Sequence, residues 1–340
     1  MHVLHVCKFR AAGASRVQMQ LKWDRGSVMD VDSEPPARQQ RYPLSYRSLF
    51  ALLRKRHFSA VVFHMQSSVP YILFALMVRF LLRSRVVFVY DIHDLNEWPS
   101  AAAAYMRFRF CVFWVLERIA IRRADKVVTV SRGLAQIYYR RYGRSLIVVY
   151  NAPAIHADSS GSPAGSRAGL VYFGLINKLR LPRHVINAIA EAGMTVDVYG
   201  VMFEKDPEYL VWLNEKVKDG CVRLMGPYSP NNLEFLSDYS FALLVFEEGE
   251  LNVRYCLPNK LFQAILQGLP CILSHGLVES RIKFKRFPEF VSTWPANKKE
   301  LAGFFALPRS LRSHMDVLEF VGALHEKSCQ RYMHCLLGGV

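Results

Sequence analysis

The sequence lacks the cysteine pattern of a disulfide-bonded or redox-active protein. Its seven cysteines are odd in number, lie scattered over 340 residues and form no Cys-x-x-Cys pair. Disulfide frameworks use paired cysteines and form in oxidising compartments. The first residues, Met1–Val6, alternate in polarity and lack the charged-then-apolar order of a secretory signal. We therefore expect a cytoplasmic protein.

A long, uninterrupted apolar segment is also missing. No formally charged residue occurs between Arg56 and Arg79, but His64, the polar stretch Gln66–Ser68 and Pro70 interrupt this interval. A membrane-spanning helix needs about 20 predominantly apolar residues. The interval is therefore predicted to form a strand and a shorter helix, and we expect any membrane contact to be peripheral.

Acidic residues are scarce in the first half of the chain. Residues 1–150 hold 24 lysines and arginines against 9 aspartates and glutamates, a net charge of +15, whereas residues 151–340 hold 20 against 19, a net charge of +1. Such a field attracts anionic partners. Nucleic acid is disfavoured because the basic residues are interleaved with bulky apolar ones, as in Tyr105–Leu116, and form no known reader motif. The predicted partner is an anionic membrane surface; the alternative is a buried helix whose arginines extend from its edges.

Length and composition predict two domains. A chain of 340 residues exceeds one typical domain, and 51% of the residues are hydrophobic, so that two domains can each bury a core. The stretch 152–168, rich in serine, glycine, proline and alanine, is the predicted linker. We expect an N-terminal domain of residues 1–151, a C-terminal domain of residues 169–313 and a final helix of residues 314–340 that packs back on the N-terminal domain.

Short apolar strands alternate with helical segments in both halves. The expected strands are Val3–Val6, Ala60–Phe63, Val86–Tyr90, Lys126–Val130, Leu146–Val149, Leu170–Phe173, Thr195–Tyr199, Val222–Met225, Phe241–Phe246 and Cys271–Leu273. Helices are expected near 45–56, 70–83, 101–123, 131–142, 206–218 and 258–267, and from Pro182 and Ser229 onward. The alternation predicts two doubly wound, Rossmann-like α/β domains with parallel sheets. Because ligands bind beyond the carboxyl ends of such strands, we expect the two domains to face each other across a cleft.

The most informative segment is Leu257–Pro270. Pro258 is tolerated in the first turn of a helix, and Gly268 and Pro270 suit its end. The first turn would then hold a lysine, Lys260, where unpaired N–H groups and the positive end of the helix dipole already favour an anion. The sequence therefore predicts a phosphate site at the start of this helix.

This segment resembles the donor-binding motif of retaining glycosyltransferases with the GT-B fold, in the family 4-like group. In that family, a Pro-Asn-Lys-Leu-Phe-Glu stretch followed by a short helix and Gly-hydrophobic-Pro holds the diphosphate and ribose of a nucleotide sugar. The resemblance implies a catalytic role for Lys260 and donor binding by Asn259, Leu261 and Gln263. The sequence departs from the family at Gln263, where Glu is common, and at Tyr255, where a second Glu often stands. An amide offers the ribose one neutral acceptor, whereas a carboxylate accepts two charge-assisted hydrogen bonds.

The segment Val171–Arg180 is similar to a second motif of the same family. It matches a Tyr-x-Gly strand end followed by basic residues that bind the donor diphosphate. Gly174 would let the backbone approach phosphate and contribute to donor binding. The resemblance implies roles for Lys178, as a catalytic residue, and for Arg180, as a donor-binding residue, and leaves open which of the two faces the donor.

Two motifs in the first half resemble the acceptor side of the family. Val89–Asp94 matches an Asp-x-His-Asp/Glu strand end, which implies that Asp91 lies on the acceptor side and that His93 is catalytic. A neutral imidazole can orient an acceptor hydroxyl or the reacting sugar by hydrogen bonding. Near the N-terminus, Gly13 and Arg16 occupy the place of a glycine-rich first loop, which implies contact with the acceptor side.

Metal binding is not expected. The segment Asp30–Asp32 matches the Asp-x-Asp of metal-dependent glycosyltransferases, but it lies in a short polar stretch before Ser-Glu-Pro-Pro, and the fold signals point elsewhere. Four potential zinc ligands, His325, Cys329, His334 and Cys335, do not fall on one face of a helix.

The cysteine pattern and the charge predict a cytoplasmic protein that is peripheral at the inner face of the membrane, and the resemblance implies that it is an enzyme. It would move a sugar from a nucleotide diphosphate sugar to a hydroxyl of a glycan or lipid-linked acceptor, with retention at the anomeric carbon and without metal or cofactor. A role in bacterial surface polysaccharide assembly is expected. The alternative is a catalytically weak homologue that acts as a membrane-associated partner in a glycan-assembly complex.

Overall fold

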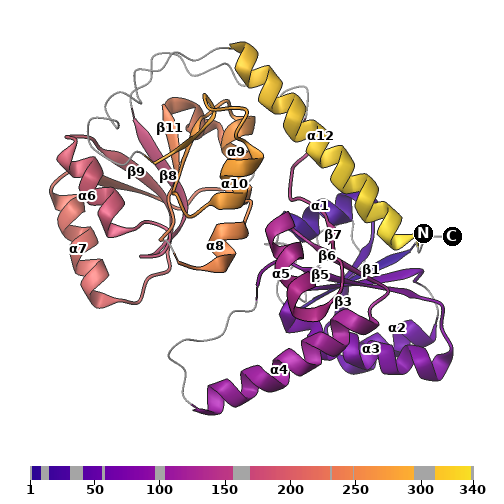
Figure 1. Cartoon of the computed structure of the whole chain (residues 1–340). Coiled ribbons are helices and arrows are strands. Elements are labelled where there is room, and N and C mark those ends of the chain that lie inside the picture. The colour runs from indigo at the N-terminus through magenta and orange to yellow at the C-terminus, as the bar shows by residue number, and fades with distance from the viewer. Residues whose placement is uncertain are drawn as a thin grey trace. The chain divides into compact units, whose positions relative to one another are not determined.

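The computed structural model divides the chain into two compact units. The N-terminal unit comprises Met1–Asn151 together with Leu324–Val340, and the C-terminal unit comprises Ala152–Ala323 (Figure 1). The structure describes residues 2–8, 15–30, 41–55, 58–95, 104–155, 169–229, 232–247, 249–294 and 311–337.

The N-terminal unit is built on a parallel sheet of seven strands, in the order β3-β2-β1-β4-β5-β6-β7. The strands are β1 (Val3–Cys7), β2 (Ser27–Asp30), β3 (Arg41–Pro43), β4 (Ala60–His64), β5 (Val87–Ile92), β6 (Lys126–Thr129) and β7 (Ile147–Val148). The helices are α1 (Ser15–Asp24), α2 (Tyr46–Arg54), η2 (Gln66–Ser68), α3 (Val69–Leu82), α4 (Ala104–Arg123) and α5 (Arg132–Tyr142). Strands β1 and β4 are buried along their whole length, as expected for central strands covered on both faces.

The C-terminal unit holds a second parallel sheet, of six strands in the order β10-β9-β8-β11-β12-β13. The strands are β8 (Leu170–Ile176), β9 (Val196–Met202), β10 (Val222–Gly226), β11 (Phe241–Leu244), β12 (Cys271–Leu273) and β13 (Val291–Thr293). The helices are α6 (Arg183–Glu191), α7 (Pro207–Lys218), η4 (Glu234–Asp238), α8 (Leu251–Tyr255), α9 (Asn259–Leu266) and α10 (Val278–Lys283). In both units, helices connect parallel strands, as the alternating sequence pattern predicts.

Helix α12 (Leu311–Leu336) contributes to both units. In its first half, Phe320 packs edge-on against Phe284 of the C-terminal unit. In its last turns, the fully buried Tyr332 packs in a core cluster with Val3 of β1. The Tyr332 hydroxyl donates a hydrogen bond to Asp24 at the end of α1 over 2.9 Å. The last turns of this helix are therefore part of the N-terminal unit's core.

Several predicted helix starts are shifted in the structure. Pro182 and Pro258 are the residues immediately before α6 and α9, whereas the sequence predicted that Pro258 lies inside the first turn. The helix predicted from Ser229 is not formed; the 3-10 helix η4 follows a few residues later, and Pro230 lies outside the described residues. Among the described residues, no helix is both long enough and apolar enough to cross a membrane.

Candidate functional site

The predicted site residues lie at or next to the point where each sheet reverses its winding direction. In the C-terminal unit, the chain runs from β8 outward to β10, then returns to β11 beside β8 and continues to β13. In the N-terminal unit, the same reversal falls between β1 and β4. At such a switch point the loops that follow the two neighbouring strands diverge and leave room for a ligand beyond the carboxyl ends of the strands.

Gly174 and Lys260 flank the switch point of the C-terminal unit. Gly174 lies near the end of β8, and Lys260 lies in the first turn of α9, the helix that precedes β12. A Cβ atom placed on Gly174 would lie 1.9 Å from Lys260 Nζ, so the lysine ammonium occupies the space that any other residue's side chain would need. Gly174 also has a φ of +148°, a conformation that L side chains rarely adopt. The glycine is therefore required for the position of the lysine.

A second glycine supports this arrangement. Gly200 of β9 pairs with Gly174 across the sheet. A Cβ on Gly200 would lie only 1.7 Å from the Gly174 carbonyl oxygen. Strand β8 continues to Ile176, so the prediction that the strand stops at Gly174 is wrong by two residues. The two glycines instead let the strands approach closely inside the sheet.

The Lys260 ammonium is held in an environment that disfavours its charge. Burial, together with the nearby positive charge of Arg180, lowers the pKa of Lys260 to about 8. A bound anion would offset both effects, because its charge attracts Lys260 and Arg180 and stabilises the charged form of the lysine. A half-buried lysine whose pKa is lowered by its surroundings is typical of a ligand site.

Of the two basic residues after β8, Arg180 is the one near Lys260. Its guanidinium lies over the Phe246 ring, with the Cζ atom 5.6 Å from the ring centroid. Lys178 instead forms an exposed ion pair, with its Nζ 2.8 Å from Asp206 Oδ2 at the start of α7. This pairing raises the pKa of Lys178. The structure thus favours Arg180 for contact with a ligand held by Lys260, and the catalytic role of Lys178 stays a prediction.

The other motif residues lie along the short helix α9. Asn259 and Gln263 are half-buried, at the first and fifth positions of the helix. Leu261 is fully buried, so a part in donor binding is left to its backbone, and its predicted role remains a prediction. Helix α9 has eight residues, and Lys260 lies in its first turn, where the N–H groups form the positive end of the helix dipole.

Asp91 is the centre of the predicted site in the N-terminal unit. It is fully buried in the last part of β5 and accepts hydrogen bonds from Arg16 Nε over 3.0 and 2.8 Å and from Arg16 Nη2 over 2.7 Å. Gln20 of α1 donates a further hydrogen bond over 2.8 Å. Burial alone would raise the pKa of Asp91, but the Arg16 guanidinium, His93 and His64 outweigh it and hold the pKa well below its usual range. Asp91 is therefore a fixed anion.

Arg16 also connects Asp91 to the end of the sheet. Its Nη1 donates to the Val149 carbonyl over 2.7 Å and to Asn151 Oδ1 over 2.6 Å. Arg16 is almost fully buried, so its charge is matched by Asp91 rather than by solvent. Gly13, the other residue predicted for this loop, lies outside the described residues, as does Asp32.

His93 is held against Asp91. Its Nε2 lies 3.2 Å from Asp91 Oδ2 and 3.4 Å from Nδ1 of His64, the last residue of β4. His64 is fully buried, and burial lowers its pKa to about 3 despite the nearby carboxylate, so this ring is neutral. His93 is only partly exposed, and its orientation is therefore determined by two buried neighbours.

A chain of buried polar side chains extends from His64 into the unit. His64 Nε2 lies 2.9 Å from His5 Nδ1, and His5 Nε2 lies 2.9 Å from Asp24 Oδ2. The rings of His5 and His64 stack with centroids 5.2 Å apart. The sequence analysis missed His5, His64 and Asp24, although the two histidines interrupt otherwise apolar central strands. A polar residue inside a fully buried strand needs a partner, and this signal points to the network.

The same cluster could be considered as a metal centre. Ligand atoms of His64, Asp91 and His93 all lie within 4.8 Å of one another. However, the Asp91 carboxylate already accepts several hydrogen bonds from Arg16 and one from Gln20. A metal ion would have to bind next to a buried guanidinium, so these residues suit an imidazole-orienting network better than a cation. Metal independence itself stays a prediction.

Known proteins resemble this chain both in a family model and in three-dimensional structure. Residues 7–152 match Glycosyltransferase Family 4. Among solved structures, the chain is similar to the lipopolysaccharide outer core galactosyltransferase WaaB in its apo form, with 13% identity, a TM-score of 0.61 and 100% of both chains covered. It is also similar to Anabaena HepE in complex with UDP and glucose, with 13% identity, a TM-score of 0.61 and coverage of 98% of this chain and 95% of that one.

A third similar structure is sucrose-phosphate synthase from Thermosynechococcus elongatus, with 14% identity, a TM-score of 0.59 and coverage of 99% of this chain and 95% of that one. No curated protein sequence matches this chain at a significant level. These structures establish the fold, and the predicted GT-B class is confirmed. Together with the family match over residues 7–152, they confirm the resemblance to GT-B glycosyltransferases and support a glycosyltransferase, whereas retention at the anomeric carbon stays a prediction.

The buried pair of Arg16 and Asp91 yields a stability prediction. Replacing Asp91 with Asn leaves the Arg16 charge buried without its counter-ion, and we expect a loss of about 3 kcal/mol in the free energy of unfolding. The double variant Arg16→Met/Asp91→Asn should lose less than the sum of the two single variants, because it removes both charges. Urea denaturation of the four proteins measures this coupling. Strictly additive losses would contradict the proposed charge pairing.

Proposed function

We propose that this protein is a glycosyltransferase that moves a sugar from a nucleotide diphosphate sugar to a hydroxyl of a glycan or lipid-linked acceptor, with retention at the anomeric carbon. The observation that carries the proposal is the position of Lys260, above Gly174 and near Arg180, at the switch point of the C-terminal sheet. Anabaena HepE, which shares the fold, was solved with UDP and glucose, and this supports a nucleotide sugar as the donor.

The chemistry of sugar transfer suits these residues. When the bond between the anomeric carbon and the diphosphate breaks, negative charge develops on the departing diphosphate. Lys260, Arg180 and the first N–H groups of α9 would stabilise this charge from fixed positions. A single preorganised donor of this kind is worth about 3 kcal/mol of transition-state stabilisation. Because fixed cations supply the stabilisation, we propose that no metal ion is needed.

The N-terminal unit would act on the acceptor side. His93 is oriented by Asp91 and His64, with Nε2 directed at the Asp91 carboxylate, which can only accept a hydrogen bond. In the neutral form of the ring, Nδ1 can therefore accept a hydrogen bond from a hydroxyl. Asp91 itself is bound by Arg16 and Gln20, so we assign it a positioning role. Arg16 in turn fixes Asp91 and Asn151 and would act through them.

We further propose a role in bacterial surface polysaccharide assembly at the inner face of the membrane. The net charge of +15 on residues 1–150 supports an anionic surface or acceptor. The similar structure of WaaB belongs to a lipopolysaccharide galactosyltransferase, which is consistent with such a role. The alternative is a catalytically weak homologue in a glycan-assembly complex, and the amide of Gln263 in place of a carboxylate is the observation that favours it.

Substitution of the cations tests the donor site. We expect Lys260→Ala to lower kcat about a hundredfold or more, since it removes a charge that stabilises the leaving diphosphate. Arg180→Ala should reduce turnover more than Lys178→Ala, because only Arg180 lies near Lys260. The matched control is Lys218→Ala, at the exposed end of α7.

The measurement is release of UDP or GDP in a screen of nucleotide sugars, with a thermal unfolding scan of each variant. Lys260→Ala should not lower the unfolding midpoint, because burial and Arg180 both oppose the lysine charge. Turnover by Lys260→Ala equal to that of the wild type would refute the assignment. If the wild type neither binds nor turns over any donor at millimolar concentration, the alternative function is favoured.

Donor affinity should also depend on pH. With a pKa of about 8, free Lys260 is charged below this pH and neutral above it. A terminal phosphate is almost fully ionised above pH 7, so its own titration contributes little there. We therefore expect the Kd for UDP or GDP to rise as the pH rises through about 8. Lys260→Arg, which keeps its charge, should abolish this dependence, and an identical pH dependence in this variant would show that another group titrates.

A further inference from the structure

Helix α4 carries an apolar stripe on its outer face. Phe108, Val112, Val115 and Ile119 are all exposed, Phe108 by 67% and Val115 by 59%. Their spacing of four, three and four residues places them on one side of the helix. The opposite side is anchored in the unit by Glu117, whose carboxylate accepts a hydrogen bond from the Tyr142 hydroxyl over 2.9 Å. The inner face of α4 packs in the N-terminal unit, so packing within this unit does not explain the apolar residues of the outer face.

Arginines border this stripe. Arg118 and Arg122 lie along one side of it and Arg123 along the other, and all three are exposed. The only carboxylate within α4 is Glu117, which is fully buried. The helix thus presents apolar side chains between cations and no exposed anion. Exposed apolar side chains bordered by arginines suit contact with an anionic membrane surface.

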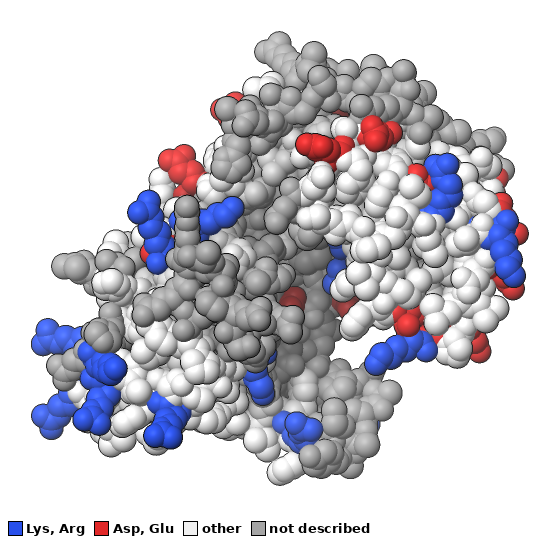
Figure 2. Space-filling view, turned by 180° about the vertical axis from the view of Figure 1, so that it is seen from behind, with Lys and Arg blue, Asp and Glu red and all other residues white. Residues whose placement is uncertain are grey.

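Helix α3, which contacts α4, extends the same surface. Met77, Phe80 and Leu81 are exposed, Phe80 by 83% and Leu81 by 68%. No acidic residue occurs in α3. On the face seen in Figure 2, blue side chains at the lower left stand out from white surface, and no red atom lies among them.

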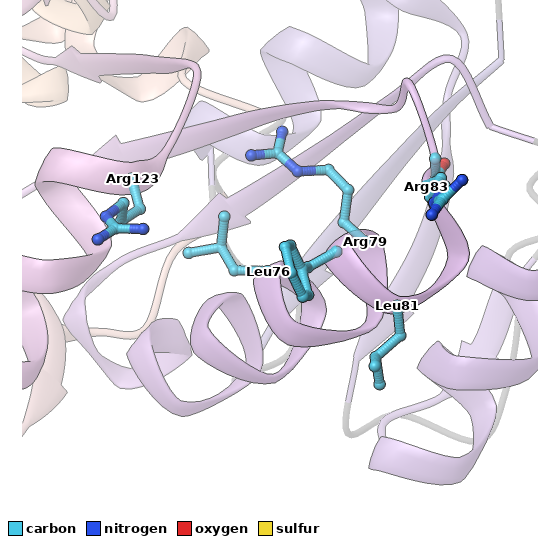
Figure 3. A pocket seen from close by; sticks show the side chains of 7 residues that line it. Leu76, Arg79, Leu81, Arg83 and Arg123 are labelled. Carbon is cyan, nitrogen blue, oxygen red and sulfur yellow. The ribbon is translucent and has the colours of Figure 1, made fainter.

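A pocket of about 660 Å³ lies where the two helices end. It is lined by Leu76, Arg79, Phe80, Leu81, Arg83, Ser84 and Arg123. Figure 3 shows that Arg79 and Arg83 come from α3 and its end, whereas Arg123 comes from the end of α4. Arg79 is bound to Asp125, which leaves Arg83 and Arg123 as the cations that face solvent at this pocket. The pocket combines two exposed apolar side chains with two cations, which suits a phosphate headgroup attached to acyl chains.

We propose that the α3–α4 surface, defined by Met77, Phe80, Leu81, Phe108, Val112, Val115, Ile119, Arg83, Arg118, Arg122 and Arg123, binds an anionic lipid bilayer. Phe80 and Leu81 insert between the acyl chains, and the arginines bind lipid phosphates around them. This inference specifies the membrane contact of the proposed function and rests on it for its biological purpose.

The charge of the surface favours binding of a lipid bilayer over binding of a second copy of this chain. A second copy of this chain would bring arginine against arginine, because Asp125, the exposed carboxylate beside this surface, already pairs with Arg79. A bilayer of anionic lipids supplies both the phosphates for the arginines and the apolar environment for the stripe.

Binding to vesicles tests the proposal. The full-length protein is sedimented with vesicles of phosphatidylcholine and phosphatidylglycerol and with vesicles of phosphatidylcholine alone. We expect strong binding only with the anionic lipid, weakened by salt. Arg118→Gln/Arg122→Gln should weaken the partition coefficient about 30-fold, since each basic residue contributes about fivefold. The control Lys205→Gln/Lys218→Gln removes two exposed lysines of the other unit and should leave binding unchanged.

A second variant tests insertion. Phe80→Ser/Leu81→Ser should weaken binding at least about tenfold, and because both side chains are already exposed, folding should be preserved. The control Val211→Ser/Ile282→Ser replaces two apolar residues that are exposed to a similar degree elsewhere. Because the chain has five tryptophans, the wild type is the reference, and we expect brominated lipid to quench Phe80→Trp more than the wild type.

Each contrary outcome would overturn the proposal. The first is equal binding of the wild type to neutral and anionic vesicles. The second is a loss of vesicle binding in the control variants as large as in the variants that they control. The third is a concentration-dependent dimer of the wild type that Phe80→Ser/Leu81→Ser abolishes. The last result would assign the surface to self-association. Failure of this proposal is distinguishable from failure of the proposed function, because Lys260→Ala should bind vesicles as the wild type does.

Discussion

The proposed function depends on one arrangement, in which a desolvated lysine ammonium occupies the space left open by a missing side chain. Lys260 reaches over Gly174 because Gly174 has no Cβ atom, and the missing Cβ of Gly200 leaves room for the Gly174 carbonyl. The protein bears the cost of holding this cation near Arg180 in a half-buried site. A bound diphosphate would remove that cost, so binding energy and the electrostatics of the leaving group come from the same two residues.

The two sheets use their switch points in opposite ways. In the C-terminal unit, Lys260 and Arg180 lie near each other close to the end of β8, and each disfavours the charge of the other. In the N-terminal unit, the charges are already balanced, because Arg16 neutralises Asp91 and both are buried. What remains accessible there is His93, a hydrogen-bonding group of fixed orientation. The proposed function therefore assigns anion binding to the C-terminal unit and the orientation of a neutral hydroxyl to the N-terminal unit.

Much of this could be predicted from the sequence because it is local. The strands that lie inside the sheets are continuous apolar runs, and the Leu257–Pro270 motif carries its own helix signals. The elements that were missed have weak local patterns. Helix α1 buries the polar side chains of Arg16 and Gln20, so its inward face does not look apolar. Strand β3 is a short edge strand that ends in Pro43.

Other features depend on contacts between distant residues and could not be predicted from local sequence. The choice between Lys178 and Arg180 follows from Asp206, which lies 28 residues beyond Lys178 and pairs with it. The role of Gly174 is determined by Lys260, and that of Gly200 by the register of β8 and β9. His5 and His64 were visible as polar residues in apolar strands, but their link to Asp24 and Asp91 required the fold.

The most direct test of the central claim is calorimetric titration of the wild type and of Gly174→Ala with UDP and GDP. The added methyl group would displace the Lys260 ammonium while leaving every charged residue in the sequence. We predict that the wild type binds at least one of the two nucleotides and that Gly174→Ala, shown to be folded by circular dichroism, binds it at least about tenfold more weakly. Equal affinity of the two proteins for that nucleotide would contradict the account.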